Sequence, residues 1–94
     1  MKTPEEVLEF YGYSIEDLQE EETILFRNPD YVTAIIGVTS DYQIVYDYDK
    51  MLDYLVQHEN MSYEDAADYL SYDTMRSLNY ISGNKPIILY SFDI

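Results

Sequence analysis

The side chains that most often carry enzymatic chemistry are scarce in this sequence. His58 is the single histidine and there is no cysteine, so a histidine-based triad, a multi-histidine metal site and a thiolate site cannot be built within one chain. We expect His58 to be a polar residue near the end of a helix, where a cation complements the dipole; a role as general base is the alternative. Carboxylate pairs are so numerous that none indicates an acid and a base.

One segment contains three aspartates, Asp41, Asp47 and Asp49, that raise the question of a divalent cation. They lack the spacing and the glycine of a calcium loop, so we expect no metal site. The sequence also lacks a glycine-rich phosphate loop and a nucleophile-elbow motif. We therefore expect a protein that is not an enzyme and has no cofactor.

The unusual feature is acid combined with tyrosine. The sequence has 19 Asp and Glu against five Lys and Arg, a formal net charge of −14, and 12 Tyr. This charge opposes direct binding to nucleic acid or to an anionic membrane and favours a basic protein surface as partner. Carboxylates three or four residues apart on a helix are about 5–6 Å apart at Cβ, a scale comparable to neighbouring backbone phosphates. The simpler interpretation is an acidic solvated surface without mimicry.

If this surface binds a partner, the contacts are expected on two predicted helices. Arg76 has two interpretations, an ion pair with Asp73 or Glu64 and a contact with the partner. The predicted partner-binding residues are Glu16, Asp17, Glu20, Glu21, Glu22, Glu64, Asp65, Asp68, Tyr69, Tyr72, Asp73 and Arg76.

The tyrosines fall into two predicted groups. Those on strands or apolar stripes are expected to use their rings in the core, whereas exposed ones between carboxylates would be aromatic anchors at an interface. The first group is Tyr46, Tyr48, Tyr63 and Tyr90, and the second is Tyr42, Tyr54, Tyr69 and Tyr72.

Capping signals predict where the helices that position these residues begin. Gly12 is placed to end the first helix in a left-handed conformation. The second is expected over Ile15 to Glu21, the third over Lys50 to Glu59 and the fourth over Tyr63 to Thr74. The capping residues are Thr3 with Pro4 and Glu6, Ser14 with Asp17, Asp49, and Ser62 with Asp65.

Three segments predict strands. Tyr31 to Val38 and Gln43 to Tyr48 are rich in β-branched and aromatic residues and form a hairpin, with Gly37 as a candidate bulge. Ile87 to Tyr90 is an uninterrupted apolar run, typical of a strand covered on both faces. We expect one domain over residues 1–94 of the α+β class, with a small three-stranded, mainly antiparallel sheet covered by about four short helices in the order ααββααβ.

From Ala34 onward the sequence contains a set of residues that recurs in a known family. They include Ile35, Ile36, Gly37, Val38, Val45, Tyr46, Tyr48, Lys50, Met51, Tyr54, Leu55, Met61, Tyr63, Glu64, Ala66, Tyr69, Tyr72, Thr74, Arg76, Leu78, Tyr80, Pro86, Ile87, Ile88 and Tyr90. In these residues the sequence resembles a family of small acidic uncharacterised proteins of Gram-positive gut bacteria and of their phages and mobile elements. The resemblance covers about 60 residues and departs from the family at Asp73, where Asn is usual, and at Asn79, where Pro is usual. It implies an intracellular, cytoplasmic protein and transfers no activity.

Charge, size and the resemblance favour a non-enzymatic binding protein. It would occupy a basic surface on a nucleic-acid-handling protein, as phage-encoded inhibitors of CRISPR or restriction systems do. The alternative is a structural or regulatory module that docks through an exposed apolar patch into a bacterial or phage assembly. The acidic N-terminus without an apolar segment leads us to expect no signal peptide.

Overall fold

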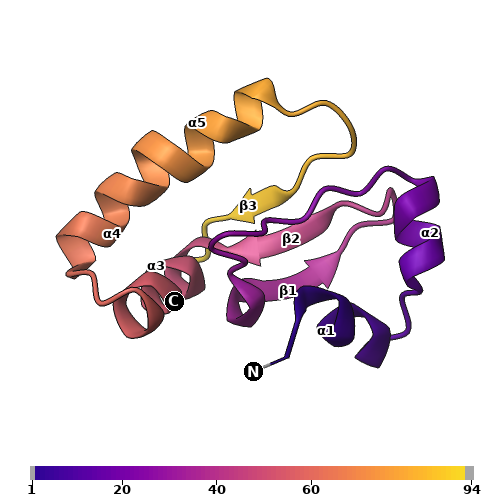
Figure 1. The fold of residues 1–94 in the computed structure, drawn as a ribbon, viewed down its shortest axis with the longest axis horizontal. Coiled ribbons are helices and arrows are strands. Elements are labelled where there is room, and N and C mark those ends of the chain that lie inside the picture. The colour runs from indigo at the N-terminus through magenta and orange to yellow at the C-terminus, as the bar shows by residue number, and fades with distance from the viewer. Residues whose placement is uncertain (1, 93–94) are drawn as a thin grey trace.

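The computed structural model describes residues 2–92 of the chain, and these form an α+β fold (Figure 1), as predicted. Short 3-10 turns occupy Val32–Ala34 and Leu78–Tyr80, and a π-helical turn, Leu70–Thr74, joins the last two helices. The helices are α1 (Pro4–Phe10), α2 (Ile15–Glu20), α3 (Tyr48–His58), α4 (Tyr63–Tyr69) and α5 (Met75–Ser77), and the strands are β1 (Ile35–Val38), β2 (Ile44–Asp47) and β3 (Ile87–Leu89).

The three strands form one mixed sheet in the order β1-β2-β3. β1 and β2 are antiparallel, and the register shifts between Ile35 and Gly37, so the predicted bulge is confirmed. β3 pairs with β2 in parallel, because the chain crosses from β2 through the helices before it returns to the sheet.

The prediction that β3 is covered on both faces is wrong. β3 lies at an edge of the sheet, and Leu89 is 45% exposed. An apolar run does not distinguish a buried strand from an edge strand by itself.

The first predicted strand begins later than expected. Tyr31 has a left-handed backbone (φ 50°) and is followed by the 3-10 turn. Its side chain is buried, and its hydroxyl is 2.7 Å from the hydroxyl of Thr74. The side-chain carboxylate of Asp30 accepts a hydrogen bond from the backbone N–H of Val32 and stabilises this turn.

Side-chain caps start the helices. The capping box of Thr3 and Glu6 is present on α1, and Ser14 and Ser62 cap α2 and α4. The prediction that Asp49 caps α3 is wrong: Asp47 accepts the hydrogen bond from the N–H of Lys50 at 3.0 Å. Because β2 ends at Asp47, strand and cap meet without an intervening loop.

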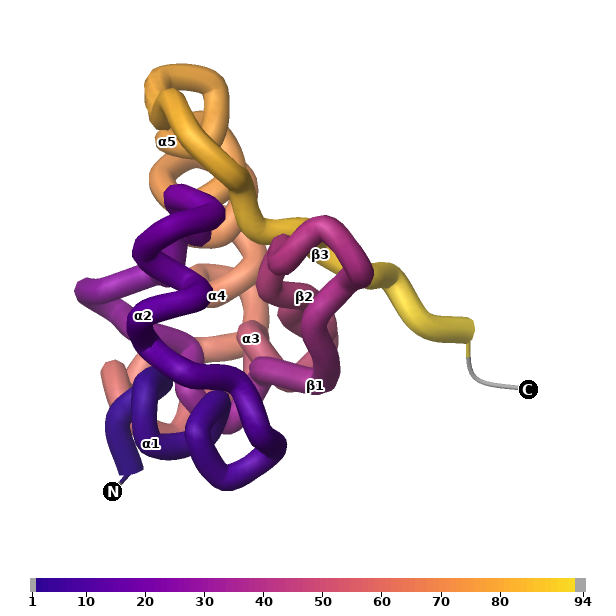
Figure 2. Tube along the Cα trace, turned by 90° about the vertical axis from the view of Figure 1, so that its right-hand side faces the viewer, coloured from indigo at the N-terminus to yellow at the C-terminus, as the bar shows by residue number. Residues whose placement is uncertain are grey.

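The buried side chains form one apolar cluster. Figure 2 shows the helices gathered to one side of the three strands, so that the cluster is enclosed between helices and sheet. The segment before the hairpin closes over it through Phe26, whose backbone N–H donates to the hydroxyl of Tyr46. The cluster contains Leu8, Leu18, Phe26, Tyr31, Val32, Ala34, Ile44, Tyr46, Met51, Tyr54, Leu55, Ala66 and Leu70.

Candidate functional site

The strongest concentration of predicted partner-binding residues lies on the outer face of α4 and the π-helical turn. The inner face is fixed by Ala66, Leu70 and Thr74, which are all buried. Residues three or four positions apart share one face of a helix. The residues at this spacing on the outer side are Asp65, Asp68, Tyr69, Tyr72 and Asp73.

These five residues and Met61 line one open hollow of about 380 Å³, which we call the α4 hollow. Tyr72 is 65% exposed, while Tyr69 is half-buried and packs against the core. The hollow therefore combines carboxylates at its rim with one anchored and one exposed aromatic ring. Such a surface can accept a cation, because carboxylates attract it and tyrosine rings bind it over their faces.

Basic residues of the chain do not neutralise the α4 hollow. Among residues 2–92, the one ion pair joins Arg27 to Glu5, with 2.6 Å between Nη1 and Oε2. The predicted ion pair of Arg76 with Asp73 or Glu64 is therefore wrong. Arg76 is exposed on α5, where it remains a candidate contact residue.

The other predicted acidic residues lie apart from the α4 hollow. Glu16, Asp17, Glu20, Glu21 and Glu22 are all exposed, on α2 and the turn that follows it. Figure 1 shows α2 and α4 toward opposite ends of the longest axis of the molecule. The two sets of carboxylates are therefore separate surfaces.

Of the four tyrosines predicted to be exposed anchors, Tyr72 is exposed, whereas Tyr69, Tyr42 and Tyr54 are not. Tyr54 is 9% exposed and contacts the rings of Tyr31 and His58, with centroids 5.6 and 4.6 Å away. Tyr42 is half-buried against the core and contacts the ring of Tyr13. Tyr54 lies inward because it follows Met51 by three residues and adjoins Leu55, and these three residues form the buried face of α3.

The tyrosines expected in the core also differ among themselves. Tyr46 is fully buried and Tyr48 is half-buried, as predicted. Tyr63 is 60% exposed, and its hydroxyl donates to the carboxylate of Asp53. Tyr90 is 58% exposed and lies against Tyr48, with 4.7 Å between ring centroids.

Sequence reasoning missed the most exposed aromatic residues. Phe10 and Tyr11 are each 71% exposed at the end of α1, Tyr80 is 86% exposed and Phe92 is 88% exposed. The positions of these residues in the sequence indicated their exposure. Tyr80 lies beyond the last apolar stripe, and Phe10 and Tyr11 lie at the end of a short helix, where rings are left outside the core.

The residues considered for metal binding have other roles. Asp47 is buried; one of its carboxylate oxygens caps α3 and the other accepts a hydrogen bond from the hydroxyl of Ser91. Across residues 2–92, no group of three or more His, Cys, Asp or Glu side chains is arranged to hold a metal ion.

Comparison with protein-family models, with curated proteins and with solved structures found no match. Over the part of the chain that is described, every helix is too short or too polar to cross a membrane. The function is therefore argued from the surface of the molecule.

Proposed function

We propose that this is a non-enzymatic binding protein whose α4 hollow takes Lys or Arg side chains from a basic surface of a nucleic-acid-handling protein. The observation that carries the proposal is the α4 hollow itself, which Asp65, Asp68 and Asp73 line together with the exposed Tyr72. The partner would lose access to its nucleic acid while this surface is occupied. The class of phage-encoded inhibitors of CRISPR or restriction systems fits this activity.

The magnitudes favour several contacts rather than one. An exposed ion pair contributes about 0.2–1 kcal/mol, and a cation over an exposed aromatic ring about 0.5–1 kcal/mol. Three carboxylates and two rings therefore give useful affinity only together. The net charge of −14 adds long-range attraction, which mainly raises the association rate at low salt.

The proposal is tested with partners captured from a bacterial lysate and then purified. The variant carries Glu64→Gln, Asp65→Asn, Asp68→Asn and Asp73→Asn, and we call it the α4 amide variant. Amides keep the shape of the side chains, and none of these carboxylates makes a side-chain hydrogen bond that holds the described fold. We expect a DNA duplex to compete with the native protein for its partner, and the α4 amide variant to bind at least tenfold more weakly.

A matched control separates the site from net charge. It carries Glu9→Gln, Asp41→Asn, Asp49→Asn and Glu59→Gln, four exposed acids outside the α4 hollow, and we call it the control amide variant. It loses the same charge and is expected to stay within threefold of native affinity. Partners that bind without competition from DNA would contradict the proposal.

A specific observation favours the second candidate function, a docking module. Phe10 and Tyr11 are exposed beside an apolar groove between α1 and β1. For such a module, salt matters little and removal of apolar side chains matters more than removal of carboxylates.

A further inference from the structure

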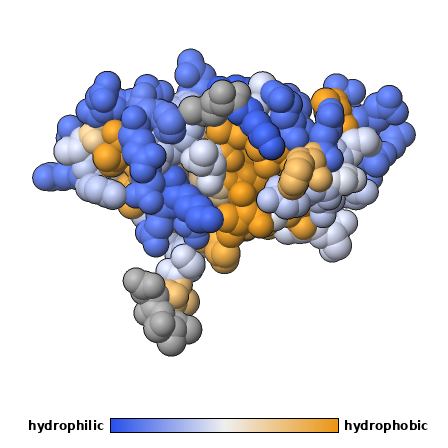
Figure 3. All heavy atoms as spheres, turned by 90° about the horizontal axis from the view of Figure 1, so that it is seen from below, coloured by the Kyte–Doolittle hydropathy of each residue, from blue (hydrophilic) through white to orange (hydrophobic). Residues whose placement is uncertain are grey.

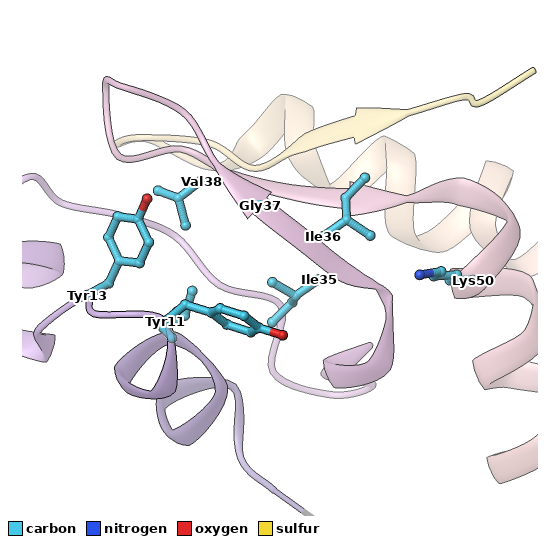
Figure 4. Close-up of a pocket in the computed structure, with 8 residues that line it drawn as sticks. Tyr11, Tyr13, Ile35, Ile36, Gly37, Val38 and Lys50 are labelled. Atoms are coloured by element: carbon cyan, nitrogen blue, oxygen red, sulfur yellow. The ribbon is translucent and has the colours of Figure 1, made fainter.

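A second surface, on the opposite side of the sheet from β3, is an apolar groove of about 580 Å³. We call it the β1 groove. In Figure 4, Tyr11 and Tyr13 border it from the α1 side, and Lys50 points toward it from the start of α3. Figure 3 shows an apolar area in the middle of the lower face, with hydrophilic residues on either side. The lining residues are Leu8, Tyr11, Tyr13, Ile35, Ile36, Gly37, Val38 and Lys50.

The β1 groove follows the edge of a strand. Successive side chains of a strand point to opposite faces, yet four consecutive residues, Ile35 to Val38, all line this groove. A hollow lined by residues whose side chains point to opposite faces of the strand must run along the strand backbone. In the sheet formed by residues 2–92, β1 pairs with β2 on one side and with no strand on the other.

The edge of β1 is accessible. The strand contains neither a charged residue nor proline, which are common means of protecting an edge from pairing, although it is short and has a bulge between Ile35 and Gly37. Ile36 is 43% exposed. A Cβ atom added at Gly37 would meet nothing within 4 Å. Backbone N–H and C=O groups on the outer side can therefore be reached by another extended chain.

The net charge of the molecule indicates which kind of partner can bind in the β1 groove. Edge pairing between two copies would bring together two bodies of net charge −14, which self-repulsion opposes. Glu6 and Glu9 are exposed on α1, the helix that forms one wall, and exposed Asp49 precedes Lys50 at the far end. A partner strand that places apolar side chains in the groove and turns basic ones away from Lys50 complements both the apolar lining and the net negative charge of the molecule.

We propose that the outer edge of β1 docks an extended segment of a partner protein in which apolar residues alternate with Lys or Arg. The segment adds a fourth strand to the sheet: backbone hydrogen bonds hold it, and the β1 groove takes its apolar side chains. The inference goes beyond the proposed function, because it uses a different surface and a different kind of contact.

Lys50 gives the site a direction. Its ammonium group is the one charge that lines the β1 groove, and it would repel a basic side chain placed beside it. Because alternate side chains of a strand point to opposite faces, the basic residues of the docked segment lie on the face away from the β1 groove, and a carbonyl oxygen lies toward Lys50.

The probe is a capped hexapeptide of alternating Val and Lys, titrated into the isotopically labelled protein. We expect shifts of the amide NMR signals of Ile35 to Val38 and slower hydrogen exchange there, and the same β1 shifts when the α4 amide variant replaces the native protein. N-methylation of alternate peptide amides removes backbone donors and should weaken binding at least tenfold, as should replacement of Val by Ser. Equal shifts with the Ser–Lys peptide, or shifts confined to α4, would overturn the inference.

Two edge residues of nearly equal exposure provide matched variants. Ile36→Lys places a charge on the β1 edge, while Leu89→Lys does so on β3, where the native side chain is 45% exposed. We expect the first to weaken peptide binding at least fivefold and the second to change it less than twofold. Equal effects would mean that binding depends on net charge and not on the β1 edge.

Two further measurements exclude the other occupants. Lys50→Glu should strengthen binding of the Val–Lys peptide, and weaker binding would contradict the placement of a basic segment beside Lys50. Sedimentation equilibrium should give a monomer, and a dimer abolished by Ile36→Lys would assign the edge to a second copy. The α4 amide variant should keep peptide binding within twofold, so failure here is distinguishable from failure of the proposed function.

Discussion

Single hydroxyl groups hold the buried tyrosines in place. The Tyr46 hydroxyl accepts the backbone N–H of Phe26 at 3.2 Å, and the hydroxyls of Tyr31 and Thr74 are 2.7 Å apart. Both rings lie in the core. Each hydroxyl therefore fixes a loop or a helical turn to the aromatic cluster, in addition to avoiding an unsatisfied buried group.

Tyr46→Phe tests this role at neutral pH. The substitution leaves the N–H of Phe26 without its partner in a buried place, and we expect a loss of about 1–3 kcal/mol in the free energy of unfolding. Urea denaturation measures it. The control, Tyr80→Phe, alters a ring that is 86% exposed and should change stability by less than about 0.5 kcal/mol; equal losses would contradict the assignment.

The dependence of stability on alkaline pH tests the buried hydroxyl group of Tyr46. Burial raises the pKa of Tyr46 from 10.0 to about 12. Between these values the unfolded chain loses a proton that the folded chain retains, so the stability contribution is complete below pH 10 and is lost as pH rises to about 12. Denaturation at several pH values should show this decline, and Tyr46→Phe should make it shallower. If stability declined with pH equally steeply in Tyr46→Phe and in the native protein, the buried hydroxyl of Tyr46 would not be the cause of the decline.

For single residues, the sequence predicted those features that depend on local sequence rules. The caps at Thr3, Ser14 and Ser62 follow from residue type and spacing alone. Tyr54 lies on the face of α3 that packs into the core with Met51 and Leu55, and Tyr63 is exposed with its hydroxyl bound to Asp53. Both are decided by tertiary contacts that a local pattern does not contain.

The helices and strands are short, so interactions at their ends contribute much of their stability. α3 is the longest helix of the described chain, and it starts directly at the end of β2 through the Asp47 cap. The same carboxylate receives the hydroxyl of Ser91 from the segment after β3. Asp47 therefore joins three parts of the fold.

Asp47→Ala and Asp49→Ala form a matched pair at this junction. We expect Asp47→Ala to cost about 1–2 kcal/mol of unfolding free energy, because it removes a helix cap. Asp49→Ala should cost only about 0.3–1 kcal/mol, because it removes just an acid from the first turn of α3. Urea denaturation compares them, and a larger loss from Asp49→Ala would reverse the assignment of the cap.

The elements show clearly where sequence reasoning ends. Their order was predictable, because each has its own cap or apolar pattern. The parallel pairing of β3 with β2 was not, because strand direction depends on how the intervening helices cross the sheet. The π-helical turn was also missed: Leu70 and Thr74 suit an α-helical period equally well.

The molecule as a whole carries more negative charge than its few cations can compensate, and one ion pair is present within residues 2–92. Like charges at this density oppose the compact state. Composition alone predicted this excess. The sequence placed the predicted contacts on two helices, but it did not predict that α2 and α4 lie toward opposite ends of the molecule, which is a property of the packed fold (Figure 1).

Salt should therefore stabilise the folded protein. Raising NaCl from about 10 mM to about 0.5 M shortens the Debye length from about 30 Å to a few ångströms and screens the self-repulsion. We expect a higher midpoint of thermal unfolding in high salt, and a smaller rise for the two amide variants. A midpoint that falls with salt would show that attractive pairs dominate.

The most direct test of the central claim is the salt dependence of the partner's dissociation constant for three proteins: native, the α4 amide variant and the control amide variant. The account predicts that native binding weakens steeply with salt, that the α4 amide variant binds more weakly with a shallower dependence, and that the control amide variant follows the native protein. Equal weakening of both variants, or native binding that salt does not change, would contradict the claim that the α4 hollow receives a basic surface.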